Sequence, residues 1–291
     1  MKIFKYFIES LFIYLLFLLF KIVGLDFSRK ISSFIITKIG FLFRKKQIIK
    51  KNILNVFKNY SDSEIDKLIQ NMWLNYSYIF AEYIHLDKFR LNKFQKEIIE
   101  IQGLNILDQI KKSNKPAIFV SGHFANFELM AMELEKRNID LSAIYRPLNN
   151  IFLNPLMVYL RKKYICKNQI KKGLSGTRET IKFLKEKTSV ALMVDQRVGE
   201  SDRYPFFGIP AHTTSIPAQL ATKFNLEIYP IYLERKKDNS FYMEVQEPIK
   251  IGKSENIEED KKKITIKINE RIENMLLRNP GQWIWTHSRW K

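Results

Sequence analysis

The sequence holds 291 residues, enough for one large domain or for one domain with an appendage. Lys and Arg number 49 against 30 Asp and Glu, so the formal net charge is +19 and an anionic partner is expected. Nucleic acid, acidic phospholipid, a phosphorylated substrate and an acidic carrier protein all fit that charge. Hydrophobic residues make up 46%, which excludes a disordered chain, and the single Cys166 excludes an internal disulfide and a cysteine-based zinc site.

Apolar residues concentrate at the amino terminus, in the segment 7–25 and again in the segment 31–43. The first contains an unbroken apolar run at 11–20, and no small-residue cleavage site follows it, so a removed signal peptide is not expected. Basic residues bracket the second segment, as suits an anionic bilayer surface. A helix that spans the bilayer, a helix that lies on it and a buried core helix are all compatible with this pattern.

If the first apolar segment spans the bilayer, the heavier Lys and Arg load that follows it places the rest of the chain in the cytoplasm. If the segment only lies on the surface, the cytoplasmic assignment is the same. The sequence therefore predicts a membrane-associated region 1–50 and a second region, 51–291, that forms one domain. No internal repeat and no convincing linker interrupts that second region.

A capping box, Ser61 with Glu64, predicts a long helix that runs to about His85. After it, short apolar runs alternate with helical patterns, which indicates an α/β fold with a mostly parallel central sheet flanked by helices. The expected strands are 117–121, 141–145, 190–194, 228–233 and 241–246. The expected helices are 126–136, 152–163, 177–187, 218–224 and 260–278.

His123 follows an expected buried strand and precedes an expected helix. In mostly parallel sheets, ligands bind at this position, just beyond the carboxyl ends of the strands. His123 comes directly after Gly122, and Glu128 lies five residues later. On one continuous helix this spacing would set the two about 140° apart, since each residue advances about 100°. If His123 lies in the turn and Glu128 in the first helical turn, the carboxylate can fold back to orient the imidazole as a general base. The spacing alone is a weak signal, since a surface or core histidine also fits it.

Five short blocks follow one another along the second region. They are 121–128 (SGHFANFE), 145–147 (YRP) with 154–155 (NP), 195–196 (DQ), 206–211 (FFGIPA) and 282–290 (QWIWTHSRW). In these blocks and in their order the chain resembles the late acyltransferases of lipid A biosynthesis, membrane-bound enzymes that acylate a phosphorylated glucosamine disaccharide precursor. The resemblance extends from the amino-terminal apolar segment to Lys291 and implies a fold similar to that of glycerolipid acyltransferases.

By position, the resemblance assigns the family's H-x4-D/E motif to His123 and Glu128, and further catalytic roles to Arg161 and Asp195. Arg161 also fits a solvated helix end together with Lys162 and Lys163. Asp195 ends a buried strand, where a carboxylate is costly, although an ion pair with Arg197 or Arg178 would explain it structurally.

Two further residues are expected to bind substrate. Arg146 follows the expected strand 141–145, and its guanidinium suits phosphate or carrier recognition. Gln196 follows Asp195 in the same block. The aromatic residues of the last two blocks suit either an acyl groove or plain core packing.

The expected reaction moves an acyl chain from an acyl thioester to a hydroxyl of a lipid A precursor, with no metal and no cofactor. His123 takes the hydroxyl proton, and backbone N–H groups of the turn, with Arg161, stabilise the oxyanion. The acidic surface of acyl carrier protein suits the positive chain, and coenzyme A is an alternative donor carrier. The bacterial inner membrane, on its cytoplasmic face, is the expected location.

Competing classes are weighed by their own motifs. A serine hydrolase needs G-x-S-x-G, and the nearest match, Gly173 to Thr177, lacks the final glycine. A nucleic-acid-binding module would explain the charge, but no zinc-finger or RNP-type motif is present. An acyltransferase acting on a glycerophospholipid or another glycolipid is the third alternative. Acyl chain length, the hydroxyl acylated and the oligomeric state are not encoded in these motifs.

Overall fold

The computed structural model describes residues 2–199, 201–250 and 254–290. Met1, Glu200, the segment 251–253 and Lys291 lie outside the described residues. Lys291, where the second predicted region and the family resemblance both end, is therefore not described.

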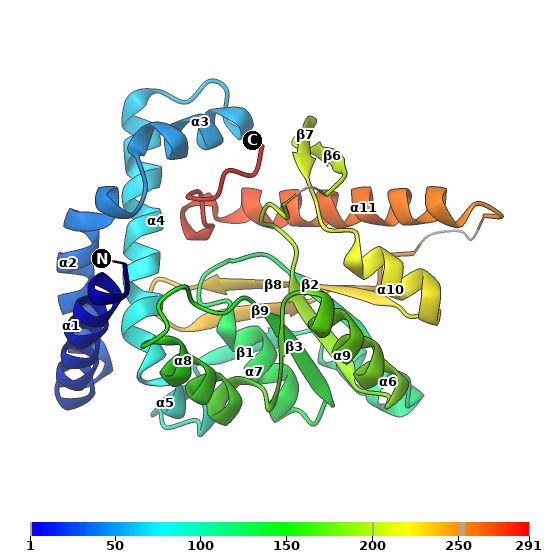
Figure 1. The fold of residues 1–291 in the computed structure, drawn as a ribbon, viewed down its shortest axis with the longest axis horizontal. Helices are drawn as coiled ribbons and strands as arrows, with labels where there is room; N and C mark the ends of the chain where they lie inside the picture. Colours follow the sequence, from blue (N-terminus) through cyan, green and yellow to red (C-terminus); the bar gives the residue numbers. More distant parts are fainter. Residues whose placement is uncertain (1, 200, 251–253, 291) are drawn as a thin grey trace.

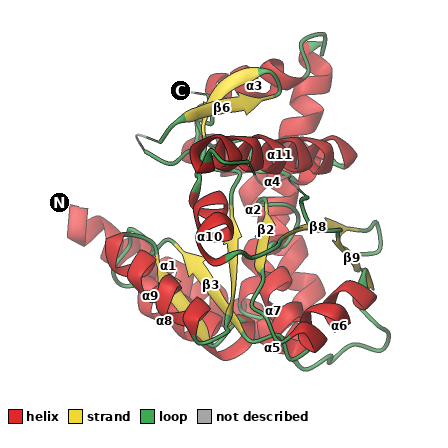
Figure 2. Cartoon of the chain, turned by 90° about the vertical axis from the view of Figure 1, so that its right-hand side faces the viewer, coloured by secondary structure: helices red, strands yellow, loops and turns green. Residues whose placement is uncertain are grey.

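A central sheet organises the fold, with its strands in the order β1-β9-β8-β2-β5-β3-β4 (Figures 1 and 2). Neighbouring strands run parallel except for β8 and β9, which are antiparallel. The strands of this sheet are β1 Ile99–Gln102, β2 Ile118–Ser121, β3 Leu141–Tyr145, β4 Asn168–Lys171, β5 Ser189–Met193, β8 Ile228–Arg235 and β9 Phe241–Val245. The predicted α/β class with a mostly parallel sheet is confirmed.

Helices precede the sheet, connect its strands and close the chain. They are α1 Lys2–Val23, α2 Leu25–Phe43, α3 Lys46–Val56, α4 Asp62–Tyr83, α5 Leu86–Arg90, α6 Leu104–Ser113, α7 Glu128–Lys136, α8 Asn154–Leu160, α9 Leu174–Lys185, α10 Ile216–Phe224 and α11 Ile257–Arg278. A π-helical turn, Arg161–Ile165, continues α8, and a 3-10 turn, Pro280–Gln282, follows α11. The capping box of Ser61 and Glu64 is confirmed at the start of α4.

Both faces of the sheet are covered, because successive residues of a strand point to opposite faces. In β2, Phe119 packs into the core shared with α5, α6 and α7, whereas Ile118 and Val120 pack into the core shared with α10 and α11. Burial on two faces explains why β2 and β5 read as continuous apolar runs rather than alternating ones. Figure 1 shows α11 on one side of the sheet and α7 on the other.

Some elements were absent from the prediction. The strands β1 and β4 have four residues each, with exposed or half-exposed positions, so they lack the apolar run that identifies β2 and β5. The fourth family block, 206–211, lies in a separate antiparallel hairpin formed by β6 Arg203–Phe206 and β7 Ile209–His212. Its turn places Phe207 and Gly208 at positive φ (53° and 72°), the conformation of a type I′ hairpin turn.

The amino-terminal helices α1 and α2 lie beside α4 (Figure 1). Within the described ranges, α1 is one helix with the length and apolar composition to cross a membrane, and 22% of its most apolar window is buried. Phe17 and Phe20 pack into the same core as the sheet. Contacts hold α1 near both ends, since Asn150 donates to the Tyr6 carbonyl oxygen (2.9 Å) and Lys21 pairs with Asp87 (2.9 Å).

Candidate active site

Sheet register brings the site together at the carboxyl edge of the parallel strands. Ser121 of β2 is the partner of Met193 of β5, so the residues two positions further along each strand, His123 and Asp195, emerge side by side. One strand further, Tyr145 of β3 is the partner of Lys171 of β4, so Arg146 and Lys172 also follow paired positions. The parallel arrangement thus gathers residues from four loops at one edge.

The imidazole of His123 is fixed by Asp195. Its Nδ1 lies 2.7 Å from Asp195 Oδ1, and its backbone N–H donates to Asp195 Oδ2 (2.8 Å). Trp283 Nε1 donates to the same Oδ2 (2.7 Å). Burial by itself would raise the pKa of Asp195, but the charge and hydrogen bonds of His123, with the Trp283 bond, lower it to about 2. The ionised carboxylate therefore accepts an Nδ1–H and leaves Nε2 as the basic nitrogen.

Nε2 of the His123 ring faces the side chain of Gln196, whose Nε2 lies 3.3 Å away. The ring also packs edge-on against Phe127, with centroids 4.6 Å apart. His123 is 16% exposed at its side chain, whereas Asp195 is fully buried. The basic nitrogen is thus directed toward the cavity while its supporting acid is shielded from water.

Glu128 does not hold the His123 ring in this structure, which corrects the expected orientation of the imidazole. Its Oε1 accepts from Arg161 Nε (3.0 Å) and Nη2 (2.5 Å), and from the Tyr83 hydroxyl (3.2 Å). The site therefore contains two separate pairs, His123 with Asp195 and Glu128 with Arg161. The register of β2 against β5 places Asp195 beside the imidazole, and Glu128, in the first turn of α7, lies against the end of α8.

Arg161 turns inward at the junction where α8 becomes the π-helical turn, whereas Lys162 and Lys163 are exposed. π-helical turns are frequent at functional sites. Burial would lower the pKa of Arg161, but the neighbouring charge of Glu128 outweighs it and the pKa rises above its ordinary value. The solvated helix end weighed for Arg161 therefore describes its two neighbours and not Arg161 itself.

The turn that carries His123 is closed by its own contacts. Gly122 is required there, since a Cβ would lie 2.6 Å from the Phe124 ring. The backbone N–H groups of His123, Phe124 and Ala125 donate to Asp195, to the Gly122 carbonyl and to the Gln282 carbonyl. These three donors are engaged within the protein, so the expected oxyanion role of the turn does not apply to them.

A cavity of about 250 Å³ opens over the site. It contains polar groups of all the predicted site residues except the buried Asp195, and an apolar wall lies beside them. The polar lining includes His123, Glu128, Arg146, Arg161, Lys172, Gln196, Arg197, Thr214 and His287. The apolar lining includes Met130, Ile144, Ile165, Leu192, Met193 and Ile216.

Three cations surround the mouth of this cavity: Arg146, Lys172 and Arg197, all exposed. Arg146 contacts Asn149 (3.4 Å), a neutral side chain. Partial burial lowers the pKa of Lys172, and the positive charge of Arg146 lowers it further. The two residues follow paired positions of β3 and β4, so their charges are brought together at this edge. Like charges held together favour an anionic ligand between them.

Sequence reasoning missed three contributors. Trp283 supports Asp195, Tyr83 supports Glu128, and His287 lines the cavity. Burial, with a smaller effect of the nearby His123 charge, lowers the pKa of His287 to about 4, so this imidazole is neutral at pH 7. Trp283 and His287 lie in the last family block and were expected only as part of it, whereas Tyr83 gave no signal in the pattern of α4.

The aromatic blocks and the alternative for Asp195 are resolved by burial. Phe206, Trp283 and Trp285 are at most 1% exposed and pack together in the core, as plain core packing predicts. Phe207 and Trp290 are half-buried and pack against the same core. The oxygens of Asp195 contact His123 and Trp283, rather than the alternative partners Arg197 and Arg178, which are exposed.

Comparison with known proteins gives the family. The sequence profile described as bacterial lipid A biosynthesis acyltransferase matches residues 1–291. The chain belongs to this family. A family member in Escherichia coli K12, a lipid A biosynthesis palmitoleoyltransferase, is 26% identical over 273 residues, which is 90% of this chain and 85% of that protein. A lipid A biosynthesis acyltransferase of Haemophilus influenzae is 23% identical over 253 residues, 85% of this chain and 78% of that protein.

Proposed function

We propose that this family member transfers a fatty acyl chain from an acyl thioester to a hydroxyl of a lipid A precursor, with His123 as the general base. The observation that carries the proposal is the His123 ring, held at Nδ1 by the ionised Asp195 with Nε2 directed into the cavity. A base fixed in one tautomer beside a binding cavity is the arrangement that deprotonates an alcohol.

In the proposed reaction, His123 Nε2 takes the proton as the hydroxyl oxygen attacks the thioester carbonyl carbon. The tetrahedral intermediate collapses, the carbon–sulfur bond breaks, and the imidazolium returns the proton to the leaving thiolate. Charge on the oxyanion is stabilised by donors at the cavity wall, for which Arg161 and Gln196 are the candidates. The apolar lining beside these residues suits the acyl chain.

The donor is proposed to be acyl carrier protein, with acyl coenzyme A as the alternative. Both carry their thioester on a phosphate-bearing arm, and the acceptor is itself phosphorylated. The cations at the cavity mouth, Arg146 among them, suit such anions.

Membrane contact is proposed for the free side of α1, at the cytoplasmic face of the bacterial inner membrane. Five apolar side chains of this helix are 59 to 70% exposed: Ile3, Phe4, Phe12, Leu15 and Leu18. Because α1 is attached to the domain near both ends, a helix that lies along the bilayer is favoured over one that leaves the domain to cross it. Phe12→Asp with Leu15→Asp should release the protein from vesicles of bacterial lipid in a flotation assay; unchanged flotation would contradict this contact.

The function is tested by acyl transfer in vitro, with acyl carrier protein thioester and a lipid A precursor as substrates. His123→Ala should lower kcat by about a thousandfold, because general base catalysis contributes on the order of 10²–10⁴. Near-normal turnover by this variant would refute the mechanism. Mass spectrometry of lipid A from a strain that lacks the protein tests the acceptor, since an unchanged lipid A profile would favour a glycerophospholipid or another glycolipid.

A further inference from the structure

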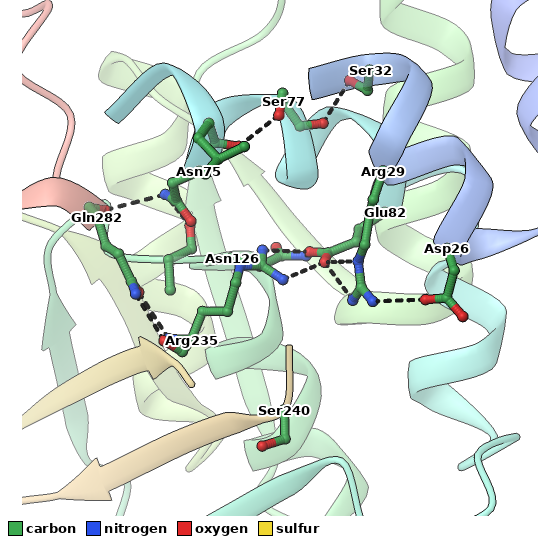
Figure 3. Close-up of polar contacts among 12 residues, drawn as sticks. Asp26, Arg29, Ser32, Asn75, Ser77, Glu82, Asn126, Arg235, Ser240 and Gln282 are labelled. Atoms are coloured by element: carbon green, nitrogen blue, oxygen red, sulfur yellow. Dashed lines mark hydrogen bonds and ion pairs between the residues drawn. The ribbon is translucent and has the colours of Figure 1, made fainter. Parts of the chain in front are cut away.

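A second buried carboxylate, Glu82 of α4, lies outside the cavity lining and joins three parts of the chain (Figure 3). Its Oε1 accepts from Arg29 of α2, at 2.9 Å from Nε and 2.7 Å from Nη2. Arg235 of β8 donates to both carboxylate oxygens, at 2.9 Å to Oε2. Oε2 also accepts from Asn126 Nδ2 (2.8 Å), which belongs to the loop between His123 and Glu128.

Permanent charges hold this carboxylate. Burial by itself would raise the pKa of Glu82, but the charges of Arg235 and Arg29 outweigh it and keep the pKa below its ordinary value. Arg235 is fixed in turn by the ring of Phe241, with 4.6 Å from the guanidinium carbon to the ring centroid. Since guanidinium groups do not titrate in the physiological range, Glu82 is a fixed acceptor for Asn126.

The loop that Asn126 belongs to needs such support. Ala125 adopts φ 44°, a left-handed conformation that costs a residue with a Cβ about 1–2 kcal/mol. Its N–H donates to the Gln282 carbonyl (3.0 Å), and its carbonyl accepts from Asn75 (3.4 Å). The Gln282 side chain bonds both backbone groups of Arg235 at 2.8 Å. Strain of this kind persists only where the surroundings over-determine the backbone.

We propose that Glu82 is a positioning residue for the acyl transfer reaction: through Asn126 it holds the loop 122–127 so that His123 meets Asp195 and Glu128 meets Arg161. This inference rests on the proposed function for the role of His123. Arg29 gives helix α2 a part in holding the loop, because it supplies one of the two charges that fix Glu82.

A matched control exists in the same molecule. Glu133 of α7 is also buried and also pairs with two cations, Lys136 (2.7 Å) and Arg137. Those partners follow it within four residues, so the cluster stays at the far end of α7. Glu133→Gln therefore reports what the loss of a buried, doubly paired carboxylate does to stability alone.

The kinetic experiment compares Asn126→Ala, Glu82→Gln and Glu133→Gln in the full chain. Asn126→Ala leaves Arg29, Glu82 and Arg235 together, so it remains informative even if Glu82→Gln fails to fold. It should lower kcat by about tenfold to a hundredfold with KM for both substrates within about twofold, as expected for a misplaced catalytic group. Glu133→Gln should lower Tm but keep kcat. An Asn126→Ala enzyme with unchanged kcat, or a Glu133→Gln enzyme with an equal loss of kcat, would overturn the proposal.

A readout without turnover separates this inference from the proposed function. Amide hydrogen exchange at residues 123–127 should quicken in Asn126→Ala and Glu82→Gln and stay unchanged in Glu133→Gln. Equal exchange in wild type and Asn126→Ala would overturn the positioning role. If wild type transfers no acyl chain to a lipid A precursor, the proposed function fails, and the exchange rates still decide whether Glu82 holds the loop.

Discussion

Two buried carboxylates serve the same loop with different partners. Asp195 pairs with an imidazole that faces the cavity, whereas Glu82 pairs with two guanidinium groups in a sealed interior. An imidazole has a ring nitrogen that can accept a proton, whereas a guanidinium group has donors only. The pair of His123 and Asp195 at the cavity is therefore suited to proton transfer. The cluster of Glu82 with its two arginines, away from the cavity, is suited to holding the loop in one conformation.

The sharpest way to break this comparison is at Asp195. Asp195→Asn should lower kcat by on the order of a thousandfold, because an amide does not hold the Nδ1–H tautomer of His123 as a carboxylate does. Steady-state acyl transfer measures this effect, with circular dichroism as the check on folding. Full activity in Asp195→Asn would show that the ring needs no acid at Nδ1.

Asp195 also predicts a dependence of stability on pH. Its pKa falls from an ordinary 3.8 to about 2 on folding, so the folded state binds fewer protons than the unfolded state between these values. The resulting stabilisation, about 2 kcal/mol, is fully present above pH 3.8 and is lost as pH falls through 2. Denaturant unfolding between pH 5 and 2 should show a shallower pH slope for Asp195→Asn; equal slopes would count against an ionised, paired Asp195.

A smaller effect is expected at the second pair of the cavity. Arg161→Lys should lower kcat by about tenfold, since one ammonium does not replace the two guanidinium contacts to Glu128. Lys162→Ala, at the exposed neighbouring position, is the matched control and should keep kcat. Full activity of the Arg161→Lys enzyme would show that the reaction does not need the two guanidinium contacts to Glu128.

The smallest effect concerns His85, which follows α4 just beyond Glu82. Its Nε2 lies 3.1 Å from the Ser28 hydroxyl of α2, and burial, with the charges of Lys21 and Lys88, lowers its pKa to about 4. The folded state therefore binds fewer protons than the unfolded state between pH 4 and 6.5, and stability is lost as pH falls through that window. The Tm of the wild type should fall by a few degrees between pH 6.5 and pH 4, and the Tm of His85→Asn should fall by less. An identical pH response in both proteins would exclude His85 as the cause.

Much of the fold could be predicted from the sequence, because the local hydrophobic patterns match the burial of side chains in the folded chain. The helix from Ser61, the strand before Gly122 and the strand before Asp195 all show the expected periodicity or apolar run. The short strands β1 and β4 lack such a pattern, because they are the two edge strands of the sheet and are partly exposed. The turn-and-helix setting of His123 was also predicted, as the residue after a buried strand.

Sequence by itself determined the composition of the site: a histidine, two acids and an arginine at strand and helix ends, in the order of the lipid A acyltransferase family. Tertiary structure alone decided how these groups pair. The register of β2 against β5 joins His123 to Asp195, and the inward turn after α8 joins Arg161 to Glu128. Spacing along the chain cannot report these pairs, because each is set by which strands and helices become neighbours in space.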